Sequence, residues 1–198
     1  MPSDAVARGR QLEYLTVGWN LAEGAASVAA GALAGSIALL GFGLDSVIEV
    51  ASGSALIWRL RYQDHLRRET AERMALRTVG ICFLALALYV LADSVQSLVR
   101  CDAPEASRLG IAVAIVSLIV MPVLARAKRG VARDLESRAM RADARQTDIC
   151  AYLSAILLAG LLLNALLGWW WADPVAGLAM VPLIAREGVR ALQGKECC

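Results

Sequence analysis

Long stretches of this chain carry almost no charged side chains, and this feature constrains its fold more than any other. Residues 24–44, 109–125 and 149–172 contain no Asp, Glu, Lys or Arg, and residues 78–99 contain only Asp93. An α-helix needs about 20 mainly apolar residues to cross the hydrocarbon core of a bilayer, and these runs are close to that length. We therefore predict an all-α polytopic membrane protein.

The overall composition agrees with this prediction. Apolar residues make up 58% of the 198 residues and charged residues only 19%, compared with about 25% in an ordinary soluble domain. A net charge of +2 excludes a strongly basic protein that binds nucleic acid. We expect a single transmembrane domain over residues 1–198 with no soluble domain. Its six transmembrane helices are expected near residues 12–33, 36–58, 75–98, 108–125, 143–168 and 174–193.

The basic residues fall on one side of this six-helix arrangement. All of the 20 Lys and Arg residues except Arg100 and Arg108 lie in residues 59–77, in residues 126–145 or near the two termini. Loops rich in Lys and Arg remain on the cytoplasmic side of a membrane. We therefore expect an integral protein of the plasma or inner membrane with both termini in the cytoplasm.

Two features mark the expected outer end of the fifth and sixth helices. Three consecutive tryptophans at residues 169–171 stand where aromatic side chains favour the interface between membrane and water. Asp173 followed by Pro174 is typical of a helix N-cap and a first helical residue. This pair predicts the start of the sixth helix.

Polar side chains inside the helices are the functional candidates, because a carboxylate at the bilayer centre costs about 3 kcal/mol even on insertion scales. The sequence holds no nucleotide-binding loop, nucleophile elbow or zinc-peptidase motif, so we expect a protein that is not an enzyme. The first helix carries Thr16, Asn20, Glu23 and Ser27, whose spacing places them on one face. Among them, Glu23 and Asn20 are candidates for an additional metal ligand or a proton carrier.

The second helix carries two carboxylates, Asp45 and Glu49, one turn apart. Asp45 lies nine residues after Ser36, so it is about 14 Å deep at 1.5 Å per residue, near the middle of the membrane. Side chains four residues apart on a helix meet, and two carboxylates in apolar surroundings repel each other. A divalent metal ion such as Zn²⁺, Mn²⁺, Fe²⁺ or Co²⁺ supplies the missing positive charge. The alternative is a protonated structural pair.

The fifth helix offers partners for these carboxylates. Gln146, Cys150, Ser154 and Asn164 fall within about 40° of one direction, at about 100° per residue, whereas Asp148 points about 160° away from Cys150. The polar face therefore favours Cys150, whose thiolate suits Zn²⁺ and similar metals, over Asp148, which can pair with arginines of the inner loop. The alternative for Cys150 is a small buried apolar residue.

These segments resemble the cation diffusion facilitator family. The matching parts of the second helix are GSIALL at residues 35–40 and LDSVIE at residues 44–49, and RADA at residues 141–144 matches the start of the fifth helix. In that family, a His or Asp and a second Asp on the second helix and a His-x-x-x-Asp pair on the fifth helix form a tetrahedral metal site. Carried over without gaps, the fifth-helix pair falls on Gln146 and Cys150. A shifted alignment places it on Ala144 and Asp148.

The resemblance implies a six-helix bundle that forms homodimers, keeps both termini in the cytoplasm and exports Zn²⁺ or a similar metal ion in exchange for protons. Its partners would be the metal ion, protons and the lipid bilayer, with no resident cofactor. The expected metal ligands are Asp45, Glu49, Cys150 and Gln146, with Glu23, Asp148 and Asn20 as additional ligands or proton carriers. Because the chain ends soon after the sixth helix, we expect a short member without the family's cytoplasmic ferredoxin-like domain. The alternative is a non-transporting membrane subunit that binds a metal or a partner.

Overall fold

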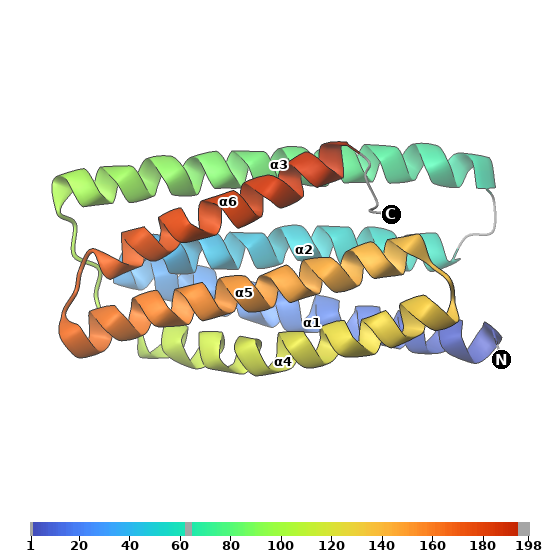
Figure 1. Ribbon diagram of the computed structural model, residues 1–198, viewed down its shortest axis with the longest axis horizontal. Coiled ribbons are helices and arrows are strands. Elements are labelled where there is room, and N and C mark those ends of the chain that lie inside the picture. Colours follow the sequence, from blue (N-terminus) through green and yellow to red (C-terminus); the bar gives the residue numbers. More distant parts are fainter. Residues whose placement is uncertain (1, 62–64, 194–198) are drawn as a thin grey trace.

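The chain folds into a bundle of six α-helices, with no strand among the described residues (Figure 1). The structure is a computed structural model that describes residues 2–61 and 65–193. Consecutive helices run in opposite directions along the long axis of the molecule. Their bounds are Pro2–Ala34 (α1), Ile37–Arg61 (α2), His65–Arg100 (α3), Arg108–Asp134 (α4), Arg138–Leu167 (α5) and Ala172–Leu192 (α6).

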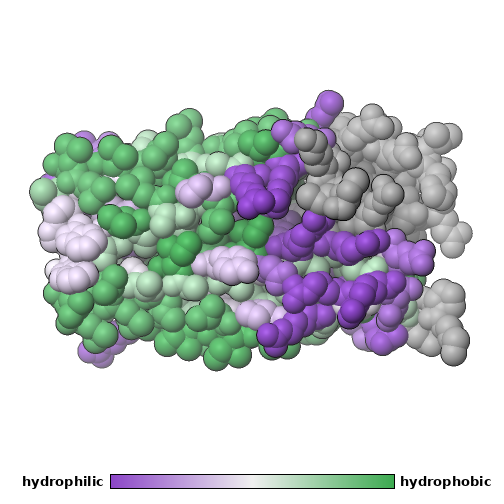
Figure 2. Space-filling view, in the orientation of Figure 1, coloured by the Kyte–Doolittle hydropathy of each residue, from purple (hydrophilic) through white to green (hydrophobic). Residues whose placement is uncertain are grey.

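The connections between helices that the structure describes lie at the two ends of the bundle. The N-terminus and the α4–α5 connection lie at one end, where the helices carry Arg126, Arg129 and Arg141, and we call it the basic end. The α1–α2, α3–α4 and α5–α6 connections lie at the opposite end, which we call the tryptophan end because it carries Trp169 and Trp171. On the face that Figure 2 shows, the surface is mainly apolar toward the tryptophan end, and hydrophilic side chains gather toward the basic end.

Among the residues that the structure describes, length and composition identify four segments that can cross a membrane, namely Ile37–Ser54, Arg77–Arg100, Arg108–Asp134 and Asp143–Leu167. Large apolar side chains on the outside of the bundle, including Leu33, Val99 and Leu166, are exposed as expected for contact with lipid. The other two helices, α1 and α6, carry polar residues that lie inside the bundle. Together, the helices form the polytopic membrane bundle that the sequence predicts.

The helices extend beyond the expected membrane spans at the basic end. The first helix begins at Pro2 rather than near residue 12, α4 continues to Asp134 rather than ending near residue 125, and α5 begins at Arg138 rather than near residue 143. Charged residues end an apolar run, but Arg, Lys and Glu are good helix formers. The charge pattern therefore marks the apolar stretches of the helices and misses the ends of the helices.

The sequence-based role of Asp173 as the N-cap of the sixth helix is wrong. The helix α6 begins at Ala172, and its N-cap residue makes no side-chain hydrogen bond. The buried Asp173 carboxylate instead accepts hydrogen bonds from Ser36 Oγ at 2.5 Å and from the backbone N–H of Ile37 at 2.9 Å. It therefore caps α2 from another helix, a contact between distant residues that a local cap motif does not reveal.

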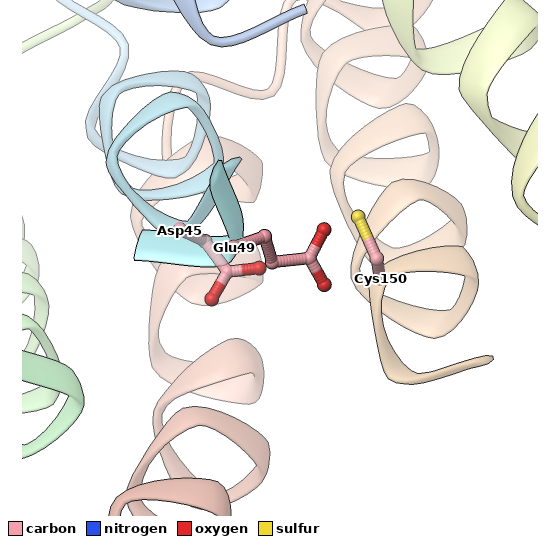
Figure 3. A group of neighbouring side chains, drawn as sticks. All are labelled: Asp45, Glu49 and Cys150. Carbon is pink, nitrogen blue, oxygen red and sulfur yellow. The ribbon is translucent and has the colours of Figure 1, made fainter. Parts of the chain in front are cut away.

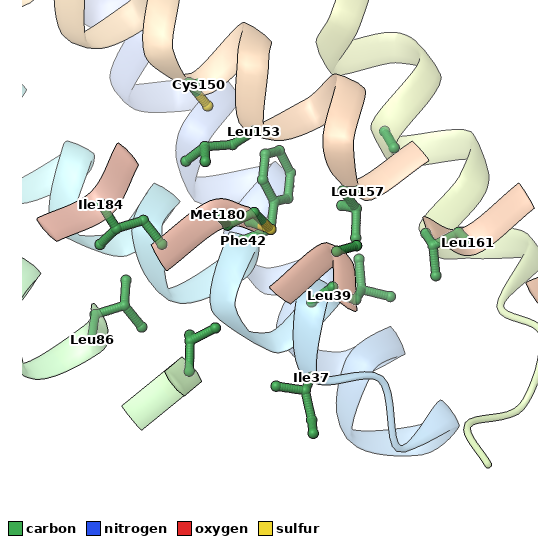
Figure 4. Close-up of a cluster of buried hydrophobic side chains, with 14 of the residues drawn as sticks. Ile37, Leu39, Phe42, Leu86, Cys150, Leu153, Leu157, Leu161, Met180 and Ile184 are labelled. Atoms are coloured by element: carbon green, nitrogen blue, oxygen red, sulfur yellow. The ribbon is translucent and has the colours of Figure 1, made fainter. Parts of the chain in front are cut away.

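The apolar core is formed mainly by α2, α5 and α6, and Leu86 and Val90 of α3 extend it (Figure 4). Phe42 of α2, Leu153 and Leu157 of α5 and Met180 of α6 are fully buried in it, and Cys150 lies in the same cluster. The helix α3 packs mainly against α6, and α1 packs mainly against α2 and α4. This packing brings the facing sides of α2 and α5 together, where the candidate site lies.

Candidate metal centre

Three metal-ligating side chains meet between α2 and α5. Asp45 and Glu49 lie one turn apart on α2, Cys150 lies on α5, and one ligand atom of each is within 4.8 Å of the other two. All three residues are buried, with exposed fractions of 4% for Asp45, 6% for Glu49 and 0% for Cys150. Figure 3 shows the Glu49 carboxylate extending from α2 toward the Cys150 thiol. We call these three residues the metal group.

Hydrogen bonding positions Glu49 within the metal group. Asn20 Nδ2 of α1 donates a hydrogen bond of 2.7 Å to Glu49 Oε2, which leaves the other carboxylate oxygen free to bind a metal. A hydrogen bond to a ligating carboxylate fixes its orientation and commonly tunes metal affinity. The sequence makes Asn20 a candidate for an additional ligand or a proton carrier. In the structure, Asn20 contacts the metal group by its hydrogen bond to Glu49.

Glu23 lies outside the metal group. Its carboxylate accepts hydrogen bonds from Ser46 Oγ of α2 at 3.2 Å and from Ser117 Oγ of α4. It is buried and does not join Asp45, Glu49 and Cys150 in the set of neighbouring ligand atoms. The serine partners were missed by sequence reasoning, because no periodic pattern within one helix shows which residues of another helix lie opposite.

The two remaining candidates on α5 separate in the structure. Gln146 Oε1 accepts a hydrogen bond of 3.3 Å from Ser52 Oγ, so this side chain links α5 to α2 one turn before Cys150. Asp148 forms an ion pair with Arg129 of α4 on the outer side of α5, with 30% of its side chain exposed. Cys150 is the α5 residue whose ligand atom lies next to those of Asp45 and Glu49.

The geometry of the metal group suits a transition-metal ion. A tetrahedral Zn²⁺ site has bonds of roughly 2.0–2.3 Å to oxygen and sulfur, so its ligand atoms lie about 3.3–3.6 Å apart. The three ligand atoms lie within 4.8 Å of one another, and rotation about side-chain bonds is the movement that would close the remaining difference. Two carboxylates and a thiolate supply three ligands, and a fourth position remains for water or another oxygen atom.

A second buried polar cluster lies nearer the basic end. Lys128 of α4 is 3.3 Å from Glu13 Oε2 of α1, forms an ion pair with Asp143 of α5, and donates to Thr147 Oγ1 at 3.4 Å. Lys128 and Glu13 are fully buried. In the sequence, Lys128 is one of the basic residues of segment 126–145, and nothing in that segment's charge pattern distinguishes it. The helical spacing could have revealed its burial. Lys128 falls on the same face of α4 as Ser117, since the buried residues of this helix follow one another at intervals of three or four.

Comparisons with known proteins agree with this arrangement. The family model described as the cation efflux transmembrane domain matches residues 15–193. The chain is 27% identical over 167 residues to the cation-efflux pump FieF of Klebsiella pneumoniae subsp. pneumoniae, covering 79% of this chain and 54% of that protein. FieF of Salmonella arizonae matches with the same identity and coverage.

A further relative is transmembrane protein 163 of Xenopus laevis, which is 25% identical over 158 residues, covering 79% of this chain and 56% of that protein. The chain thus spans about half the length of each of these relatives. The family match includes α2, α5 and the metal group that they hold. This chain belongs to the cation efflux family.

Proposed function

We propose that this protein exports a divalent metal ion across the membrane in exchange for protons, and that Zn²⁺ is its preferred ion. The observation that carries the proposal is the metal group, a set of two carboxylates and a thiol buried between two helices. An ionisable residue inside a membrane is costly unless it is paired or used. The names of the FieF relatives, cation-efflux pumps, support the same direction of transport.

The proposed preference for Zn²⁺ follows from the ligand types. Thiolate is a soft ligand that favours Zn²⁺ over Mg²⁺ and Mn²⁺, whereas carboxylates accept all of these ions. A site with one sulfur and two oxygens therefore binds Zn²⁺ more tightly than Co²⁺ or Fe²⁺, and those more tightly than Mn²⁺. The metal is the transported substrate in this account and not a resident cofactor.

Exchange for protons follows from the chemistry of the same ligands. A carboxylate or thiol must lose its proton before it binds a metal, so a proton and a metal compete for Asp45, Glu49 and Cys150. When the site faces the side of higher acidity, protons displace the metal. When it faces the other side, the metal displaces the protons. The two fluxes then run in opposite directions.

We further propose that the basic end faces the cytoplasm, so that both termini are cytoplasmic. The support is the distribution of Lys and Arg, of which only Arg100 and Arg108 belong to the tryptophan end. The resemblance to the family also supports a homodimer. Both points are measurable, the first by proteolysis of sealed vesicles of known orientation and the second by native mass spectrometry of the purified protein.

Transport by purified protein in liposomes loaded with a metal-sensitive dye tests the proposal. We expect saturable Zn²⁺ flux that depends on an imposed pH gradient and that Asp45→Asn abolishes. Asp148→Asn is the matched control, because it removes a carboxylate that pairs with Arg129 outside the metal group, and it should retain the flux. Folded wild-type protein that moves none of Zn²⁺, Co²⁺, Fe²⁺ and Mn²⁺ would contradict export and favour a non-transporting metal-binding subunit.

A further inference from the structure

A row of buried polar side chains runs along one face of α1, past the metal group. Its members are Glu13, Thr16, Asn20, Glu23 and Ser27, spaced alternately three and four residues apart, and all are buried. The row begins at the level of Lys128 near the basic end and reaches beyond the level of Glu49 toward the tryptophan end. Such a row inside a membrane bundle is costly unless its polar atoms find partners.

The row has a charged entrance at the basic end. Lys128 lies between the Glu13 carboxylate and the Asp143 carboxylate, and Asp143 is the member of this cluster that reaches the surface, with 13% of its side chain exposed. One ammonium group balances only one of the two carboxylates. The remaining negative charge can hold one proton, so this cluster can exchange a proton with water at the basic end.

Several atoms along the row have no hydrogen-bond partner among the described protein atoms. They are Glu13 Oε1, Asn20 Oδ1 and Ser27 Oγ on α1 and Gln146 Nε2 on α5. Buried polar atoms are almost always hydrogen-bonded, either to protein or to ordered water. Three of these atoms lie on one continuous face of α1, and Gln146 lies between Asp143 and Cys150 on α5, so ordered water molecules are the partners that remain for them.

The spacing between the entrance and the metal group fits a short chain of water molecules. Glu13 and Asn20 are seven residues apart on α1, and Asp143 and Cys150 are seven residues apart on α5, so each pair is separated by about 10 Å along its helix. Hydroxyl groups of Thr16 and Thr147 lie within these intervals. Two or three water molecules at hydrogen-bond distances of about 2.8 Å would bridge them.

We propose that this polar row, with Lys128, Asp143 and Thr147, binds a chain of ordered water molecules that carries protons between the basic end and the metal group. Each step moves one proton from one oxygen atom to the next along a hydrogen bond, so only O–H bonds break and form. Glu13 is the proton-carrying residue at the entrance, and Lys128 holds it in place. The role of this water chain in transport rests on the proposed exchange of metal for protons. The presence of the water chain itself does not depend on that proposal.

Hydrogen–deuterium exchange of the buried carboxylic acids tests this proposal without any metal. Full-length protein in lipid is transferred to D₂O, and the infrared carbonyl band of protonated carboxyl groups is followed over time. We expect Glu13→Gln and Asp143→Asn each to slow exchange of the remaining band roughly tenfold or more, since each removes a positioned proton-transfer group. In the wild type, the Asp148 carboxylate pairs with Arg129 on the outer side of α5. The control variant Asp148→Asn should therefore exchange at the wild-type rate.

Two results would overturn the proposal: exchange at the wild-type rate in both Glu13→Gln and Asp143→Asn, or a metal-free wild-type protein with no carboxylic-acid band. If one of these variants does not fold, Thr147→Val removes a hydroxyl of the same cluster and is expected to slow exchange as well. Calorimetric titration with Zn²⁺ shows whether the metal group is intact in each variant. If the wild-type protein does not transport Zn²⁺, the proposed function is refuted, but slowed exchange in the variants would still support the water chain.

Discussion

Replacing Lys128 by Met should destabilise the protein strongly, because it leaves two carboxylates inside the bundle without their cation. Lys128 has 0% of its side chain exposed and contacts Glu13 Oε2 at 3.3 Å as well as Asp143. Removing one partner of a buried ion pair costs roughly 3–5 kcal/mol. Met has a similar volume and shape, so little of this loss comes from an empty space.

The neighbouring residue provides a matched control. Arg129 also pairs with a carboxylate of α5, Asp148, but 44% of the Arg129 side chain and 30% of the Asp148 side chain are exposed. Exposed ion pairs contribute about 0–1 kcal/mol, so Arg129→Met should change stability little. The two variants alter consecutive residues of α4, and burial is the main difference between them.

The assay is reversible unfolding in mixed detergent and denaturant, followed by tryptophan fluorescence. Native proteins are stable by about 5–15 kcal/mol, so the expected loss in Lys128→Met is a large share of the total. A triple variant that adds Glu13→Gln and Asp143→Asn should recover much of the loss, because it removes the unpaired charges. Equal losses in the two single variants, or no recovery in the triple variant, would refute this reasoning.

Four further outcomes are expected. Cys150→Ser should weaken Zn²⁺ binding about tenfold or more and reduce the preference for Zn²⁺ over Mn²⁺ in calorimetric titrations, whereas unchanged affinity would remove the thiol from the site. Asn20→Leu should lower Zn²⁺ affinity by roughly 10–100-fold because Glu49 loses its donor, and normal binding would show that the 2.7 Å hydrogen bond has no such role. Asp173→Ala should cost about 1–3 kcal/mol of unfolding free energy, because the Ser36 hydroxyl and backbone N–H groups at the start of α2 lose their acceptor, and wild-type stability would argue against that cap. Zn²⁺ affinity should fall as pH falls, since protons compete for the ligands, and titrations in buffers of different pH that give one constant affinity would exclude this competition.

The number of helices and their order could be predicted from the sequence, because lipid excludes charge from long segments. The sequence also predicts that Asp45 and Glu49 lie on the same face of α2, since side chains four residues apart on a helix share one face. The choice of Cys150 over Asp148 rests on the same periodicity, and the structure places Asp148 against Arg129 instead. These relations all lie within a single helix.

Relations between helices could not be predicted in the same way. The capping of α2 by Asp173 depends on how α6 meets α2, and the burial of Lys128 depends on the approach of α1 and α5 to α4. Gln146 shares a helix face with Cys150, yet its carbonyl oxygen meets Ser52. The relative rotation and shift of packed helices decide such contacts, and a periodic pattern in one helix contains neither quantity.

X-ray absorption spectroscopy at the zinc edge, on purified protein loaded with one equivalent of Zn²⁺, tests most directly whether the metal group binds a metal. The account predicts one sulfur ligand at about 2.3 Å, with the remaining ligands being oxygen at about 2.0 Å. Cys150→Ser should remove the sulfur contribution, whereas Cys82→Ser, at an exposed thiol on α3, should retain it. A zinc spectrum without sulfur in the wild type, or one that keeps its sulfur in Cys150→Ser, would contradict the proposed site.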